Sequence, residues 1–279
     1  MRSRLALVMA LLIAALIVVP LASWGWGVNG DRLIVNKALD TLPADIQQYF
    51  EANRNFLVRH VSDPLDQLTK TPTDKRNHFI RLDHYGQLPF STLPRDYRTA
   101  VFKFGKHNLE MYGLLPWQIG VSSVRLTGAF RAHNWDEARQ AAAELAYYVA
   151  AAHDPFNTTM NDDGKLSGQP GVNQRFGISL VDRYSLFFYV RPNEASYIRD
   201  PTDYAFEMCL NAHSWLENIL LSDRRARQGL ADYTDEFYDR FYSQAGAVLI
   251  REISDASTDV GSYWLTAWTN AGRPQLPTR

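Results

Sequence analysis

Residues 134–152 of this chain read NWDEARQAAAELAYYVAAA. Alanine is the strongest helix former, and apolar residues recur at helical spacing along a face that includes Ala138 and Leu145. Asn134 stands just before this pattern, and asparagine is a favoured residue at the N-cap of a helix. The stretch therefore predicts a helix over Trp135–Ala152 whose apolar face must pack against other helices.

The same helical period recurs along most of the chain, while the strict alternation that is typical of strands is nearly absent. Two segments, 61–75 and 153–171, contain the Pro, Gly, Asn and Asp residues of loops, and long irregular segments in compact domains are often functional. We therefore expect an all-α fold, a single-domain helical bundle. Further helices are expected near Asn29, from Pro43, Pro94, Pro116 and Pro201, over Arg175–Tyr189, and from about Thr234 towards Trp268.

Composition places the chain among globular proteins. Hydrophobic residues make up 46% of its 279 residues, which excludes a disordered chain. The 29 basic and 30 acidic residues give a net charge of −1, so no overall electrostatic attraction to nucleic acid is expected. The single cysteine, Cys209, excludes an intrachain disulfide and a cysteine-based zinc site.

The N-terminus has the pattern of a secretory signal peptide. Two arginines precede an unbroken apolar run, Leu5–Val19, which is shorter than the ~20 residues that a membrane-spanning helix needs. Small residues precede Trp26 and would allow cleavage there. We expect a signal peptide over 1–25, one domain over 26–279, and export to the periplasm or outside the cell. The alternative is an uncleaved segment that anchors the protein to a membrane.

Four ordered segments give a more specific signal: Trp26–Ala38, Asp63 with Asn77–Phe79, Tyr147–Asn157, and Gly171–Gly177. Together they resemble the zinc-dependent phospholipase C and single-strand-specific nuclease superfamily. The resemblance implies an all-α fold and an ancestry in phosphodiester hydrolysis. In that family three zinc ions activate a water molecule, and the mature N-terminal residue binds metal through its own backbone.

The resemblance also identifies where this chain departs from the family. Trp26, Asp63 and His78 keep a metal-binding group, and Asp31 replaces a histidine but still offers a carboxylate. The other positions hold residues that zinc disfavours or cannot bind, because zinc prefers imidazole, thiolate and carboxylate. A three-zinc centre would also bring six positive charges, whereas Asp31 and Asp63 supply only two negative charges to balance them. The substituted family ligand positions are Tyr147, Ala151, Asn157, Asn173 and Gly177.

Two functional hypotheses follow from this loss. The first is a non-catalytic binding or scaffold protein, a pseudoenzyme whose cleft takes an unknown small-molecule, lipid or phosphodiester ligand. The second is a metal-dependent phosphodiester hydrolase with one metal at Asp63 and His78, completed by Asp31 and the Trp26 amine. In the second, Asp63 is also the candidate catalytic base. The expected cofactor is accordingly none or one weakly bound divalent metal such as zinc, and not three zinc ions.

Other polar motifs favour structural roles. His153 and Asp154 are candidates for replacement metal ligands, but a His followed by Asp-Pro is typical of the end of a helix. Asn161–Gly164 resembles part of a calcium loop, but the glutamate that such a loop requires at its twelfth position is missing, which favours a turn. His213 lies among apolar residues and is expected to be a hydrogen-bonded core histidine.

Overall fold

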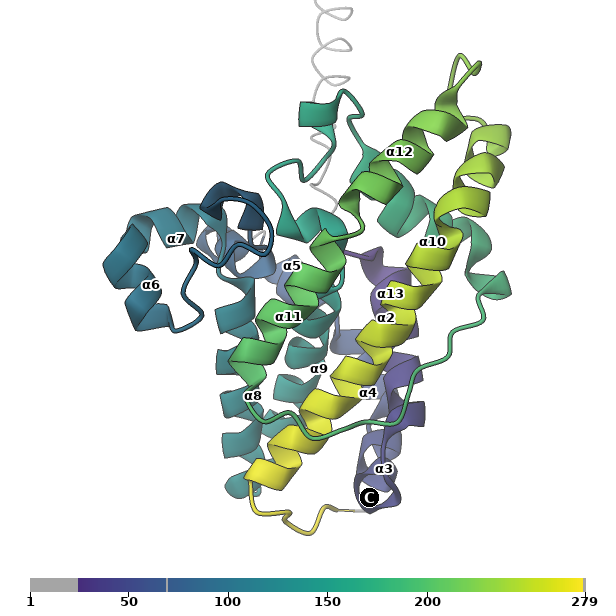
Figure 1. Ribbon diagram of the computed structural model, residues 1–279. Helices are drawn as coiled ribbons and strands as arrows, with labels where there is room; N and C mark the ends of the chain where they lie inside the picture. The colour runs from purple at the N-terminus through teal and green to yellow at the C-terminus, as the bar shows by residue number, and fades with distance from the viewer. Residues whose placement is uncertain (1–24, 69, 278–279) are drawn as a thin grey trace, which may run out of the picture.

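The computed structural model describes residues 25–68 and 70–277, and within these ranges the chain forms helices and no strands (Figure 1). The expected all-α class is confirmed. The predicted signal peptide lies outside the described residues, apart from Gly25. In the part of the chain that the structure describes, no helix combines the length and apolar character needed to cross a membrane.

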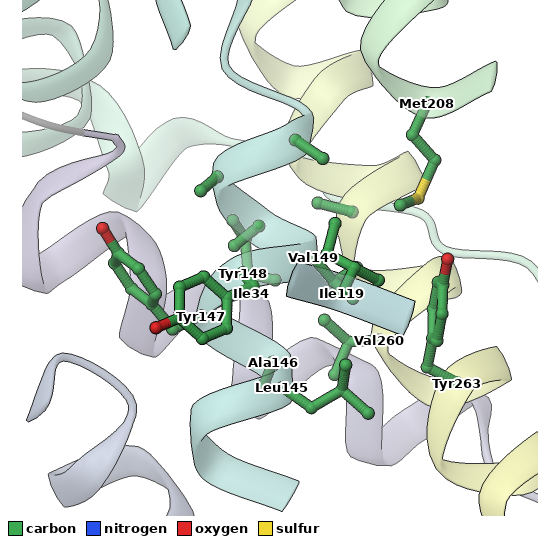
Figure 2. Packing of buried hydrophobic residues seen from close by; sticks show 14 of the residues in the cluster. Ile34, Ile119, Leu145, Ala146, Tyr147, Tyr148, Val149, Met208, Val260 and Tyr263 are labelled. Carbon is green, nitrogen blue, oxygen red and sulfur yellow. The ribbon is translucent and has the colours of Figure 1, made fainter. Parts of the chain in front are cut away.

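The predicted alanine-rich helix is α9 (Trp135–Ala152), and it lies at the centre of the core. The Asn134 side chain accepts a hydrogen bond from the Glu137 amide at 3.2 Å, as an N-cap does. The small alanine side chains allow close packing of α4 (Arg54–His60), α8 (Leu115–Arg131) and α13 (Asp235–Asn270) against it. Figure 2 shows Tyr147 on one side of α9, with Met208 and Tyr263 on the other.

The longest helix, α13, forms a second support of the core. It begins after Thr234, as predicted, and packs against α2 (Gly27–Ala38) and α9. Trp264 ties α13 to α9, since its indole donates to the Ala142 carbonyl at 3.0 Å. Gly261 allows the chain to approach closely, because a Cβ atom there would lie 2.0 Å from Thr41 Oγ1.

Several expected helices are shorter than the sequence suggested. The helix from Pro94 is split at Gly105, whose φ of +79° lies in the left-handed region that helices cannot continue through. The helix expected over Arg175–Tyr189 is a π-helical turn followed by two short helices, and it ends at Phe187. The separate helices are α3 (Ala44–Ala52) and α4, α6 (Tyr97–Phe104) and α7 (Lys106–Tyr112), α11 (Pro201–His213) and α12 (Leu216–Arg227), and η6 (Gln174–Ser179), α10 (Leu180–Tyr184) and η7 (Ser185–Phe187).

The two segments expected to be irregular contain only short helical turns. The first holds α5 (Asp63–Gln67) and leads into η2 (Pro72–His78), which is followed by η3 (Leu82–Tyr85). The second holds η4 (Pro155–Thr158) and η5 (Lys165–Ser167). These turns bring His78 and Asn157 toward the end of α9, where Ile80 donates its amide to the Asn157 carbonyl at 2.8 Å.

An extended segment, residues 188–198, crosses α13 on its way to α11 (Figure 1). We call it the strap. Hydroxyl side chains spaced four residues apart on α13 accept hydrogen bonds from backbone amides of the strap. The pairs are Arg191 with Ser254 at 3.2 Å, Asn193 with Thr258 at 2.9 Å, Ser196 with Ser262 at 3.0 Å, and Ile198 with Thr266 at 2.8 Å.

Candidate functional site

His78 and Tyr147 form the centre of the candidate site. The histidine ends η2, the tyrosine projects from α9, and both side chains are about 1% exposed. The Tyr147 hydroxyl lies 2.6 Å from His78 Nδ1. Burial lowers the pKa of His78 to about 4 and raises that of Tyr147 well above 10.0, so both groups are neutral near pH 7.

A hydrogen bond between two neutral groups of this kind can run in either direction, and we assign the phenol as its donor. A neutral phenol has one proton to donate, and Nδ1 is the atom within its reach, so Tyr147 donates to His78. The imidazole proton then resides on Nε2, which has no hydrogen-bond partner among the described residues. In this arrangement Nδ1 is occupied by the phenol and Nε2 by a proton, and neither presents a free lone pair to a metal.

Asp31 lies nearby in the interior, on α2. Its carboxyl group is 1% exposed, and the Ser62 hydroxyl donates to it at 3.4 Å. Burial raises the pKa of Asp31 to about 8, against the smaller lowering by Ser62, and the charge of Asp154 raises it further. Burial likewise raises the pKa of Asp154 to about 7. The pair thus has one or both carboxyls protonated near neutral pH, which reduces the charge left in the interior.

The structure does not bring Asp63 to His78. Asp63 begins α5 with its side chain one-third exposed, and its Oδ2 lies 2.8 Å from Nδ1 of His60. Trp26 is fully buried instead, and its indole donates to the Ala150 carbonyl at 2.9 Å. Of the four residual ligand positions, Asp31 and His78 are therefore buried near Tyr147, Trp26 anchors α2 to α9, and Asp63 forms a separate pair.

The remaining family positions lie around the same end of α9. The Ala151 carbonyl accepts a hydrogen bond from the side chain of Asn157 at 2.9 Å, which uses the amide for local packing. Gly177 lies on η6 next to Gly25, and Asn173 is the residue that precedes η6. A Cβ atom at Gly177 would lie 3.1 Å from the Gly25 carbonyl oxygen, so even a small side chain there would press on the backbone.

These donors do not fit the zinc centre that the resemblance implies. Within residues 25–68 and 70–277, no group of three or more His, Cys, Asp or Glu side chains is arranged to hold a metal ion. The reason is visible in the contacts: the Tyr147 phenol occupies His78, Ala151 has no side-chain donor, and Asp63 pairs with His60. We therefore derive no reaction step through zinc.

His153 and Asp154, adjacent in sequence, serve different partners. Asp154 is the N-cap of η4 and accepts the Phe156 amide at 2.9 Å, while His153 is the C-cap of α9, which ends at Ala152 where the sequence predicted a helix end. His153 lies between Glu252 and Asp259 of α13, at 3.2 Å and 3.0 Å. Burial opposes a charge on His153, but hydrogen bonds to the two carboxylates outweigh it and raise its pKa to about 10. His153 is therefore an imidazolium at pH 7.

Sequence reasoning missed this ionic cluster. Glu252 and Asp259 stand seven residues apart on the buried face of α13, among the apolar positions Val248, Ile253 and Val260. Two acids at core positions of an amphipathic helix were the available signal, because a buried acid requires a partner. The partner, His153, directly follows the last residue of α9 and is more than ninety residues away in sequence.

The other polar motifs have structural roles. Asn161–Gly164 forms the expected turn, in which the Gly164 amide donates to the Asn161 carbonyl at 3.1 Å. His213 is partly buried, and its Nδ1 lies 3.0 Å from the Thr158 hydroxyl. Cys209 is a fully buried free thiol.

A second buried ion pair also lay outside the sequence predictions. Arg175 binds both carboxylate oxygens of Asp223, with distances of 2.8 Å and 3.1 Å, and both residues are buried. The pair joins η6 to α12 and stabilises the loop that precedes η6.

Comparisons with known proteins add no family to this geometry. No protein-family model matches the chain, and no curated protein sequence matches it either.

Proposed function

We propose that this chain is an exported, non-catalytic relative of the zinc-dependent phospholipases C and nucleases, and that it acts by binding. In this proposal the former metal pocket has become part of the core. The single observation that carries it is the buried hydrogen bond of 2.6 Å between the Tyr147 hydroxyl and His78 Nδ1. A tyrosine hydroxyl there takes the position at which an active relative would present its imidazole to a metal.

The burial of this pair supports the same proposal. A hydrolytic centre needs a water molecule and a substrate phosphate next to the metal ligands. His78 and Tyr147 are each about 1% exposed, and the rings of Tyr147 and Tyr148 pack against the imidazole with centroids 5.2 Å and 5.6 Å away. Aromatic packing thus fills the space around the histidine and leaves it without access for a phosphodiester.

The test is the metal content and activity of the purified mature protein. We expect well under one zinc per chain by elemental analysis, and no chelator-sensitive hydrolysis of bis(4-nitrophenyl) phosphate with added Zn²⁺, Mn²⁺ or Ca²⁺. Two or more tightly bound zinc ions would overturn the proposal. Metal-dependent turnover that His78→Ala abolishes would favour the one-metal hydrolase instead, and Asp63→Asn would then show whether Asp63 contributes.

A further inference from the structure

A polar cavity lies on the other side of α9 from His78 and Tyr147. It has a volume of about 330 Å³ and is bounded by α11, α13 and the strap, with His153 at its floor. Figure 1 shows α11 and α13 running side by side in front of α9. This volume lies at the small end of the roughly 300–1,000 Å³ that is usual for ligand sites, and it suits a molecule of a few heavy atoms.

The walls of this cavity are unusual for two helices of one bundle. Helices in a bundle normally face each other with apolar side chains. Here α11 presents Tyr204, Glu207 and Asn211 at helical spacing, and α13 presents Asp255 and Thr258 toward them. The polar faces leave a gap between the helices where a dry contact would be expected.

The cavity carries a negative charge. Four carboxylates line it, together with the two cations His153 and Arg251, and Arg95 forms an ion pair with Glu207 from outside the lining, so the formal sum is 3 − 4, or −1. Glu207 and Asp255 lie at the rim with side chains 48% and 44% exposed. The other two carboxylates, Glu252 and Asp259, are buried at the floor.

The floor itself is an incompletely neutralised ion cluster. His153 bridges Glu252 and Asp259, and the Tyr204 hydroxyl donates to the second oxygen of Asp259 at 2.8 Å. One imidazolium between two carboxylates leaves one negative charge, and Glu252 and Asp259 are only 3% and 6% exposed. A buried charge without a counter-charge is unfavourable, so the floor favours the approach of a cation.

The mouth of the cavity already holds a cation on an aromatic ring. The Arg251 guanidinium lies 5.4 Å from the Trp215 ring centroid, and its Nε lies 3.5 Å from Asp255. Because the Arg251 side chain is 64% exposed, this contact is weak and can be exchanged for another cation. The indole face and the Asp255 carboxylate thus form a site with the chemistry of an ammonium receptor.

We propose that the cavity between α11 and α13 binds a small aliphatic amine with two primary ammonium groups. One ammonium donates hydrogen bonds toward Glu252 at the floor, and the other lies between Asp255 and the Trp215 ring at the mouth. The alkyl chain between them contacts Met208. This site goes beyond the function proposed above, and its cavity does not include His78 or Tyr147.

The experiment is a calorimetric titration of the mature protein at pH 7 with 1,4-diaminobutane, and in parallel with 1,4-butanediol. The diol has the same chain length and no charge. We expect saturable binding of one diamine per chain, weakened by added salt, and no binding of the diol. Equal binding of both compounds, or no binding of the diamine at low salt, would overturn the proposal.

Two variants locate the site. Asp255→Asn removes a rim charge and is expected to weaken diamine binding about threefold to tenfold, while Glu252→Gln removes a buried charge and should weaken it more than tenfold. Asp45→Asn on α3 is the matched control, because it removes an exposed charge away from the cavity, and it should leave affinity unchanged.

If the Glu252→Gln variant misfolds, the Asp255→Asn variant at the rim still tests the site. Unchanged affinity in Asp255→Asn, or equal weakening in Asp45→Asn, would contradict the site. Zinc content is read separately, so failure of this proposal leaves the non-catalytic proposal standing, and the reverse also holds.

Discussion

The Tyr147 hydroxyl lies 2.6 Å from Nδ1 of His78, within the hydrophobic core. The donor is the phenol, so the imidazole is expected in its Nε2–H form. Nitrogen-15 NMR of the histidine rings checks this assignment directly. A spectrum in which His78 is protonated at Nδ1, or titrates near pH 6.5, would contradict the hydrogen-bond direction on which the metal argument depends.

Removal of the Tyr147 hydroxyl tests how much this hydrogen bond contributes to stability. Tyr147→Phe leaves a buried Nδ1 without a partner and is expected to lower the free energy of unfolding by about 1–3 kcal/mol. Tyr148→Phe is the control, since the Tyr148 ring packs on the same imidazole while the hydrogen bond to Nδ1 comes from Tyr147. Denaturant unfolding measures both. Equal losses in the two variants would mean that the hydroxyl of Tyr147 contributes nothing specific.

A variant that supplies the zinc ligands implied by the resemblance tests that resemblance. Combining Tyr147→His with Ala151→Asp places an imidazole and a carboxylate at two of the substituted family ligand positions on α9, close to His78 and Asp31. We expect this variant to take up zinc that the parent does not, with a zinc-dependent rise in melting temperature. Adding His78→Ala should remove the gain. A double variant that folds but is indifferent to zinc would weaken the inferred ancestry.

Asp31 is expected to reduce stability as the pH rises. Its pKa is about 8 in the folded state and 3.8 in a model compound, so between these values the folded chain holds a proton that the unfolded chain loses. Stability therefore falls as pH rises from about 4 to 8. Asp31→Asn should flatten this slope and raise the free energy of unfolding at pH 8 by at least about 1 kcal/mol. Denaturant unfolding of Asp31→Asn and of the parent at pH 5 and pH 8 measures this difference. A lower free energy of unfolding for the variant at both pH values would contradict the prediction.

His153 gives a pH dependence of the same direction, in a higher pH range. Its pKa is about 10 when folded and 6.5 in a model compound, so the folded state holds the extra proton between these values. The contribution is complete below pH 6.5 and is lost as the pH rises towards 10. His153→Ala leaves two buried carboxylates facing each other and should lower stability by about 3–5 kcal/mol at pH 6. The deficit should shrink at pH 10. A deficit that is independent of pH would argue against a charged histidine.

The Arg175 and Asp223 pair should contribute more than a surface pair of the same type. Asp223→Ala leaves a buried guanidinium and is expected to cost about 3–5 kcal/mol. Asp235→Ala breaks the exposed pair with Arg183, which has a similar distance of 2.7 Å, and should cost at most about 1 kcal/mol. Thermal and denaturant unfolding of the two variants provide the comparison. Similar losses would mean that burial does not decide the value of these ion pairs.

Much of the fold was predictable because helical periodicity and caps are local signals. Asn134 and Thr234 marked the starts of α9 and α13, and both long helices lie where the pattern placed them. The breaks at Asn53, Gly105 and Ser214 were missed, since an apolar stripe can continue across a break that only three-dimensional packing imposes. The ligand positions were assigned through the resemblance to a family, and matched motifs cannot tell that Asp63 turns toward His60.

The candidate site was likewise only partly predictable from the sequence. His78, Tyr147, Asp31 and Asn157 were named from the motif, and all are buried around one end of α9. Asp154 was read only as a cap, although its charge also influences Asp31. The His153 cluster needed the register of α9 against α13, and no local pattern encodes that register.

The strap has a consequence for how this protein behaves at high concentration. Extended chain on a protein surface commonly offers free amides, which can pair with another molecule and start aggregation. Here the amides of Asn193, Ser196 and Ile198 are bonded to hydroxyls of α13, and that of Ala195 to the Thr41 carbonyl. The hydroxyl side chains of α13 thus pair with these amides as a neighbouring strand does within a sheet, and the paired amides are not available for β-type self-association.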